Sequence, residues 1–250
     1  MSEKEWFASW FDSPFYHVLY AHRNDTEAKQ FIDKLVAELN LPSSAKVLDL
    51  ACGKGRHSIT LAQKGFIVTG ADLAANSIAE AEQSRINLGL ENLRFVVHDM
   101  RTPIADSKFD AIFNLFTSFG YFETLDENHS VCQSIHQMLD AQGVFVLDFL
   151  NATRVISNLV TNEVVQRGSI AFHIDRWHNS NHIYKKIKIV DSENQEHGIF
   201  VERVQALGLD DFERLFGPYF QIVATYGAYD LSPFDRQSSD RLILIVKKKA

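Results

Sequence analysis

Cysteine is scarce in this sequence, which holds only Cys52 and Cys132 among 250 residues. Two such distant cysteines supply neither a disulfide framework nor the paired spacing of a zinc site. His173, His178 and His182 fall close together, but no cysteine accompanies them and no HExxH pattern occurs. We therefore expect no metal in the functional site, and we interpret Cys52 as a small packing residue rather than a nucleophile.

An excess of positive charge is also absent. The chain carries 25 Lys and Arg against 32 Asp and Glu, which gives a formal net charge of −7. Proteins that bind long polyanions usually present a clustered basic surface. The only basic run here is the KKK of residues 247–249. We therefore expect no nucleic-acid partner.

Long apolar runs are missing as well. No stretch approaches the roughly 20 apolar residues of a membrane-spanning helix, and the start MSEKEWFASWF does not resemble a secretory signal. A cytoplasmic protein with no membrane partner is expected. The aromatic segment at residues 6–20 could lie on a membrane surface, but it has few basic residues. We favour its interpretation as a lid over the active site.

What is present is a regular alternation of strand-like and helix-like segments between residues 45 and 150. Short apolar runs such as KVLDL and FIVTGAD are each followed by a segment with helical periodicity. This alternation predicts right-handed crossovers and a parallel sheet covered on both faces. One expected helix, NSIAEAEQSRINLG, begins with Asn76 or Ser77 as its cap, and another covers NHSVCQSIHQMLDAQG.

The pattern changes at about residue 164. Three strand-like runs, IAFHIDRWH, HIYKKIKIVD and HGIFVERVQAL, predict an antiparallel meander, and a short helix and two strands follow. The expected fold class is α/β: a doubly wound, mostly parallel, seven-stranded Rossmann-like sheet with an antiparallel C-terminal strand pair and a small antiparallel insert. We expect a single domain over 1–250, divided into a helical lid (1–44), a cofactor-binding core (45–150), the β insert (164–206) and a closing helix and strands (207–250).

The loop after KVLDL is the first candidate for a binding site. Gly53 and Gly55 allow backbone to approach a ligand closely, and Asp72 ends the next strand about 20 residues on, where a carboxylate can bind both ribose hydroxyls. A nucleoside-type ligand is therefore expected. The dinucleotide fingerprint fails, because its third glycine position is Ser58 or Arg56, and no P-loop occurs. A nicotinamide oxidoreductase is disfavoured accordingly.

The segment DLACGKGR resembles motif one of the class I S-adenosylmethionine-dependent methyltransferases, with Ala51 where many members carry glycine. GADLAANSI, VVHDMRTP and FDAIFNLFTSFGYF resemble the second, third and fourth motifs, in the family's order. The resemblance implies that Asp72 binds the ribose, that Asp99 faces the adenine amino group, and that residues 114–116 line the methionine end. The cofactor-binding residues that it implies are Asp49, Ala51, Gly53, Gly55, Asp72, Leu73, Asp99, Met100, Asn114, Leu115 and Phe116.

A finer resemblance concerns the acceptor side. FTSFGYF is similar to a segment of amino-sugar N,N-dimethyltransferases and of relatives near glycine N-methyltransferase. Those proteins also carry a pair of tyrosines followed by a basic residue, which Tyr16, Tyr20 and Arg23 resemble. The comparison implies that Arg23 pairs with the cofactor carboxylate and that Tyr16 or Tyr20 covers the sulfonium. Tyr121 is the first candidate for a catalytic group and Tyr16 the second, although both could be ordinary wall aromatics.

The expected acceptor is a small polar molecule, with an amine preferred over a hydroxyl. Phe119, His173 and Arg176 are the candidate substrate-binding residues, although strand alternation puts His173 and Asp175 on one face and Arg176 on the other. Two alternatives stay open: O-methylation of a small molecule, and a non-catalytic protein that binds S-adenosylmethionine. The oligomeric state expected is a monomer, or a homodimer through the β insert.

Overall fold

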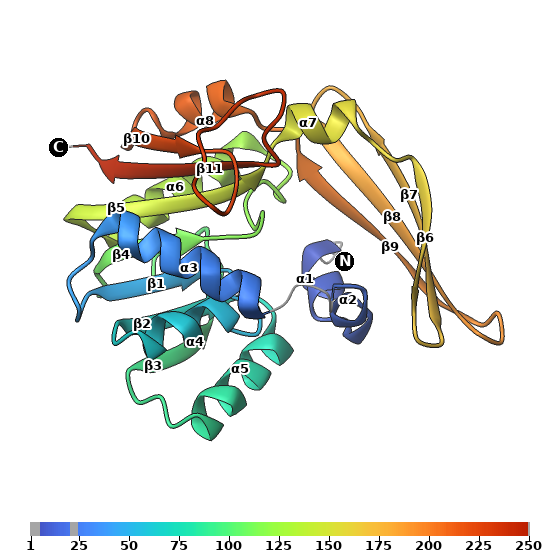
Figure 1. The fold of residues 1–250 in the computed structure, drawn as a ribbon, viewed down its shortest axis with the longest axis horizontal. Coiled ribbons are helices and arrows are strands. Elements are labelled where there is room, and N and C mark those ends of the chain that lie inside the picture. Colours follow the sequence, from blue (N-terminus) through green and yellow to red (C-terminus); the bar gives the residue numbers. More distant parts are fainter. Residues whose placement is uncertain (1–5, 21–24, 250) are drawn as a thin grey trace.

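Seven strands form the larger of two sheets, in the order β10-β11-β5-β4-β1-β2-β3 (Figure 1). The computed structural model describes residues 6–20 and 25–249. Strands β1 to β5 run parallel, and β11 lies antiparallel to β5 and β10. The fold class predicted from the sequence is confirmed. The strands are β1 (Lys46–Leu50), β2 (Ile67–Asp72), β3 (Leu93–Val97), β4 (Phe109–Asn114), β5 (Leu139–Leu150), β10 (Phe220–Tyr226) and β11 (Arg241–Lys248).

The direction of winding reverses at β1. This strand pairs with β2 on one side and with β4 on the other. All three run parallel, so Leu50, Asp72 and Asn114 end their strands at the same edge of the sheet. Open α/β sheets bind their ligands outside the carboxyl ends of the strands, at such a switch point.

Helices cover both faces of this sheet (Figure 1). On one face, α3 buries Phe31, Ile32 and Leu35 completely, because their spacing places them on a single helical stripe. On the other face, α8 buries Phe212 and Phe216 beside α6. The helices of the larger sheet are α3 (Asp25–Leu39), α4 (Arg56–Gln63), α5 (Ala75–Asn87), α6 (Leu125–Met138) and α8 (Leu209–Phe216).

A second, antiparallel sheet follows the short helix α7 (Ala152–Ser157). Its strands, in order, are β6 (Asn162–Arg167), β7 (Ile170–His178), β8 (His182–Asp191) and β9 (Glu196–Gln205). The sequence indicated three of these strands and missed β6. The signal of β6 is weak because it is a short edge strand of mostly polar residues, and Val164 is exposed.

Two short helices, α1 (Trp6–Phe11) and α2 (Pro14–Leu19), lie between the two sheets (Figure 1). Trp10 and Leu19 are buried against one face of the second sheet, where they meet Phe172, Ile174 and Ile187. The side chains of that face alternate with polar ones, as a half-buried strand requires. Within the described ranges, no helix is both long and apolar enough to cross a bilayer.

Two predicted helix starts need correction. α5 begins at Ala75 after Ala74, so neither Asn76 nor Ser77 is its cap. α6 begins at Leu125, earlier than predicted, because Thr124 caps it and Glu127 completes a capping box.

Candidate functional site

A cavity of about 390 Å³ opens at the carboxyl edge of β1, β2 and β4. This volume lies in the range of small-molecule sites, about 300–1,000 Å³. Residues of α1 and α2 form part of its wall, and the loops after β1, β2, β3 and β4 form the rest together with the first turns of α4 and α5. The predicted site residues that line it are Tyr16, Tyr20, Ala51, Gly53, Asp72, Leu73, Asp99, Met100, Leu115, Phe116 and Tyr121.

The loop after β1 approaches the cavity with unusual backbone geometry. Ala51 and Gly53 have φ of 62° and 55°, in the left-handed region that glycine adopts without penalty. A Cβ on Gly53 would meet nothing within 4 Å, so this glycine leaves open space beside the cavity. Gly55 does not line the cavity. A Cβ there would lie 2.4 Å from the ring of Phe95, so the structure explains this glycine by packing.

Asp72 joins the first two loops at the cavity wall. One carboxylate oxygen accepts from the amide of Gly53 and the other from the amide of Ala74, both at 2.8 Å. Burial raises the pKa of Asp72, while the backbone amides oppose that shift. Each carboxylate oxygen has two lone pairs, so both can still accept a hydroxyl hydrogen from a ligand.

Two predicted cofactor residues lie behind the wall and do not line the cavity. Asp49 is 1% exposed and accepts a hydrogen bond from Ser58 Oγ at 2.6 Å. Burial is the main cause that raises its pKa to about 6, and the hydroxyl of Ser58 partly offsets it. Asn114 is fully buried and donates to the carbonyl of Leu50 at 2.9 Å, which ties β4 to the end of β1.

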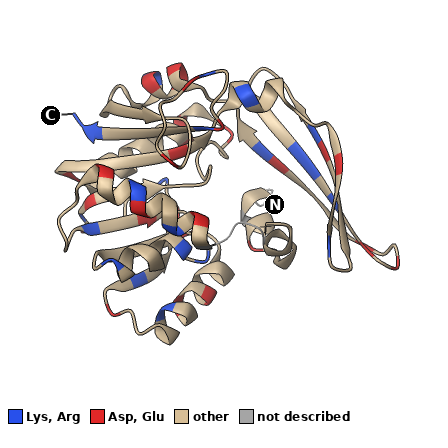
Figure 2. Cartoon of the chain, viewed as in Figure 1, with Lys and Arg blue, Asp and Glu red and all other residues tan. Residues whose placement is uncertain are grey.

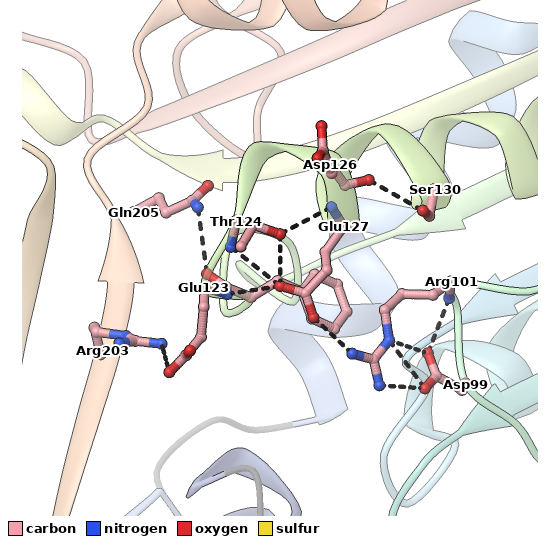
Figure 3. Close-up of polar contacts among 10 residues, drawn as sticks. Asp99, Arg101, Glu123, Thr124, Asp126, Glu127, Ser130, Arg203 and Gln205 are labelled. Carbon is pink, nitrogen blue, oxygen red and sulfur yellow. Dashed lines mark hydrogen bonds and ion pairs between the residues drawn. The ribbon is translucent and has the colours of Figure 1, made fainter.

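Asp99 reaches the cavity from the loop after β3 (Figure 3). Arg101 holds its carboxylate in a forked contact, in which Nη2 donates at 2.6 Å and Nε at 3.1 Å. Burial raises the pKa of Asp99, but the hydrogen bonds and charge of Arg101 outweigh this effect, so the pKa lies below its usual range. Asp99 is therefore an ionised acceptor at neutral pH.

Aromatic rings form another part of the cavity wall. Phe11 from α1 lies 5.0 Å from the ring of Tyr16 and 5.3 Å from that of Tyr121, so it brings the two candidate catalytic tyrosines together. Tyr20 donates from its hydroxyl to Glu202 of β9 at 2.8 Å. The hydroxyl of Tyr20 also accepts from Lys185 Nζ of β8 at 2.6 Å. The wall is thus assembled from the N-terminal helices, the loop after β4 and the second sheet.

Sequence reasoning missed several wall residues. The guanidinium of Arg56 lies 4.0 Å from the ring centre of Phe116, and the imidazole of His57 lies tilted against the same ring, with the ring centres 5.1 Å apart. Burial lowers the pKa of His57 to about 3, so this imidazole is neutral. The available signal was the position of both residues directly after the second glycine of DLACGKGR. Phe7, Phe11 and Phe122 also line the cavity, although the sequence alone does not separate aromatic residues of the wall from those of the core.

The structure does not place the three predicted substrate residues at the cavity. Phe119 is fully buried in the core against Phe212. His173 is exposed on the outer face of β7, because the alternation of the strand turns its neighbours inward. Arg176 pairs with Glu163 of the edge strand β6. Arg23 lies outside the described residues.

The residues present suit an adenosine-containing sulfonium cofactor. Asp72 offers a carboxylate beside the open space at Gly53, Leu73 and Met100 offer apolar surface, and Asp99 offers a second acceptor. Across residues 6–20 and 25–249, His, Cys, Asp and Glu do not form a group of three that could hold a metal ion.

Comparison with known proteins agrees with this geometry. A family model described as a methyltransferase domain matches residues 41–199, well over half of the chain. Glycine/sarcosine N-methyltransferase from Halorhodospira halochloris is 30% identical over 136 residues, which cover 54% of this chain and 50% of that protein. The chain spans about half the length of the curated relatives it matches.

Solved structures share the fold over nearly the whole chain. An S-adenosylmethionine-dependent methyltransferase from Clostridium acetobutylicum superposes with a TM-score of 0.79 at 20% identity, covering 94% of this chain and 96% of that one. An amino pentose methyltransferase from Micromonospora echinaspora, with S-adenosylmethionine bound, gives 0.70 at 20% identity, covering 95% and 98%. The match of the family model over residues 41–199 shows that the chain belongs to the methyltransferase domain family.

Proposed function

We propose that the protein transfers a methyl group from S-adenosylmethionine to a small polar molecule, with an amine preferred over a hydroxyl. The observation that carries this proposal is one cavity whose wall includes Asp72 together with Tyr16 and Tyr121. Such a cavity has room for a nucleoside and, beyond it, for a small acceptor.

The proposal gives the wall residues the roles that the motif resemblance implies. Asp72 would hold the ribose, Asp99 and Met100 the adenine, and Leu115 and Phe116 the methionine end. Bound S-adenosylmethionine supplies an electrophilic methyl group on a positively charged sulfur. Tyr16 and Tyr121 would align the acceptor with that methyl group and exclude water, and the hydroxyl of Tyr121 would act as the general base that takes the proton lost by the acceptor. Orientation alone can supply about 7–11 kcal/mol of the barrier.

Three features support a small amine as acceptor. The N-terminal helices form part of the cavity wall, and a cavity of about 390 Å³ suits a small molecule better than a polymer. Lys and Arg are interspersed with Asp and Glu along the ribbon (Figure 2). Aromatic rings such as those of Phe11 and Tyr16 attract cations, and two of the similar proteins are named as a glycine/sarcosine and an amino pentose methyltransferase.

The test is a screen of candidate acceptors, with S-adenosylhomocysteine detected as the product. Amines such as glycine derivatives and amino sugars are compared with matched alcohols, with tRNA and with a protein mixture. We expect turnover with a small amine. Turnover with tRNA or protein alone would contradict the small-molecule proposal.

With an acceptor identified, Tyr121→Phe tests the acceptor side of the cavity. This change removes the hydroxyl and keeps the ring that packs on Phe11. We expect kcat to fall at least about 100-fold, a loss typical of a general acid–base group, with cofactor affinity within about twofold. Tyr184→Phe is the control, because that ring stacks on Trp177 outside the cavity wall. Full turnover in Tyr121→Phe would remove Tyr121 from the mechanism.

A further inference from the structure

We propose that Arg101 is a positioning residue that fixes the carboxylate of Asp99 and so makes the site selective for a 6-aminopurine over a 6-oxopurine. The proposal rests on the proposed function, because it takes the cofactor adenine to lie at Asp99. It concerns a residue outside the cavity wall that acts only through its contact with Asp99.

The contact between the two residues restrains the carboxylate in three ways (Figure 3). Arg101 Nη2 donates to Oδ2 of Asp99 at 2.6 Å, and Nε lies 3.1 Å from both oxygens. The backbone amide of Arg101 donates to Oδ1 at 2.9 Å. A forked contact of this kind fixes the plane of a carboxylate as well as its position.

Arg101 is itself braced from the opposite side. Its Nη1 donates to Oε1 of Glu127 at 2.8 Å (Figure 3). Glu127 cannot swing freely, because its other oxygen accepts from the amide and hydroxyl of Thr124 in the capping box of α6. The guanidinium also lies 4.8 Å from the ring centre of Phe122. The orientation of Asp99 is thus tied to the start of a helix.

The bonds that Arg101 makes also limit what Asp99 can accept. A carboxylate has about four acceptor positions. The backbone amide of Arg101 donates to Oδ1, Nη2 donates to Oδ2, and the Nε–H is shared between the two oxygens. These three N–H groups leave one of the four positions, on an ionised carboxylate that can only accept. It matches a single N–H of an amino group and repels the carbonyl oxygen of a 6-oxopurine.

A freely moving carboxylate would discriminate less. A 6-oxopurine carries a hydrogen on the adjacent ring nitrogen, and an unrestrained Asp99 could shift to accept it. Selectivity therefore depends on the fixed position that Arg101 imposes, and it should fall when Arg101 is replaced while Asp99 is kept.

The experiment compares calorimetric affinities for S-adenosylhomocysteine and S-inosylhomocysteine in the full chain. We expect wild type to prefer the adenine form by roughly 10- to 150-fold, the range for a hydrogen bond to a charged group. Arg101→Gln should lose most of this preference. Arg101→Lys keeps the charge without the fork and should also lose much of it. The result for Arg101→Lys separates positioning from charge. This variant also tests the proposal if Arg101→Gln does not fold.

Arg85→Gln is the matched control. Arg85 makes the same forked contact with Glu82 on the surface of α5, outside the cavity wall. Its removal should leave the preference unchanged. Wild-type preference in both Arg101 variants would overturn the inference and leave the proposed function standing. A wild-type protein that binds neither compound would contradict the proposed function itself.

Discussion

At the scale of single residues, Asp49 shows how the first binding loop affects stability. Its carboxyl is buried, and its pKa is raised to about 6 in the folded protein from an ordinary value of 3.8. Below about pH 4 both folded and unfolded chains hold the proton, so the folded state pays no free energy for burying a charged carboxylate. As pH rises from about 4 to 6, the unfolded chain releases the proton first, and the folded state loses stability relative to it. The full loss, on the order of 3 kcal/mol, is present above about pH 6.

Asp49→Asn tests this pH dependence. The amide oxygen can still accept from Ser58 Oγ, but no charge is buried at neutral pH. We expect the free energy of unfolding of the variant, relative to wild type, to rise between pH 4 and 7 by on the order of 3 kcal/mol. Urea unfolding across this range measures the difference. A difference that does not change with pH would show that Asp49 is not the group responsible.

At this scale, the sequence predicted those residues whose place at the cavity follows from their position in a motif. Asp72 and Asp99 follow directly after their strands, so the parallel sheet brings them to one edge, and the sequence located both. His173 and Arg176 follow no such rule. Which face of β7 turns toward the cavity depends on how the second sheet packs on α1 and α2, and no local pattern encodes that packing.

At the scale of elements, the contact between the N-terminal helices and α5 joins two parts of the cavity wall. Asp12, between α1 and α2, accepts from the amide of Asn76 at 3.1 Å and from its side chain at 2.8 Å. Ala74 provides no side-chain cap for α5, so Asp12 takes this role from 64 residues away. A carboxylate at this position also interacts favourably with the positive end of the helix dipole. Sequence reasoning looked for the cap within the helix and therefore chose Asn76 or Ser77.

The N-terminal helices are attached more strongly to the second sheet than to α5. Trp10 donates from its indole nitrogen to Glu202 at 2.7 Å, and Tyr20 shares the same carboxylate. Trp10 and Leu19 are buried there, whereas the Asp12 contact is exposed. When the cavity opens to admit the cofactor, we expect the contact at Asn76 to break first.

Asp12→Ala tests this order of opening. Without the contact, the closed arrangement over a bound cofactor should be less stable by about 0.5–1 kcal/mol, typical of a lost helix cap. We expect S-adenosylhomocysteine to dissociate roughly two- to fivefold faster in stopped-flow displacement. Asp191→Ala is the control, because that carboxylate also accepts backbone amides, but in the β8–β9 turn outside the cavity wall. Equal dissociation rates in Asp12→Ala and wild type would contradict this role.

At the scale of the whole molecule, the order of elements was predictable and the docking of its parts was not. Alternating strand and helix patterns, with glycines at the helix ends, predicted the seven-stranded sheet correctly. The sequence did not indicate strand β6, because an edge strand needs few apolar residues. Strands β7, β8 and β9 carried the alternating pattern that predicted the meander. The cavity itself combines α1 and α2 with loops from four strands of the sheet. Contacts of such long range leave little trace in local sequence.

The central claim is that this cavity holds S-adenosylmethionine through Asp72, and calorimetric titration of wild type and Asp72→Asn tests it most directly. Asparagine cannot provide the two ionised oxygens that Asp72 presents at the wall. A lost hydrogen bond to a charged group costs about 1.5–3 kcal/mol, so the predicted loss of affinity is roughly 10- to 150-fold. Asp110→Asn is the matched control, because Asp110 accepts the backbone amide of Lys46 at the opposite edge of the sheet. It should bind as wild type does. Equal affinity in Asp72→Asn and wild type, or no binding by wild type, would contradict the claim.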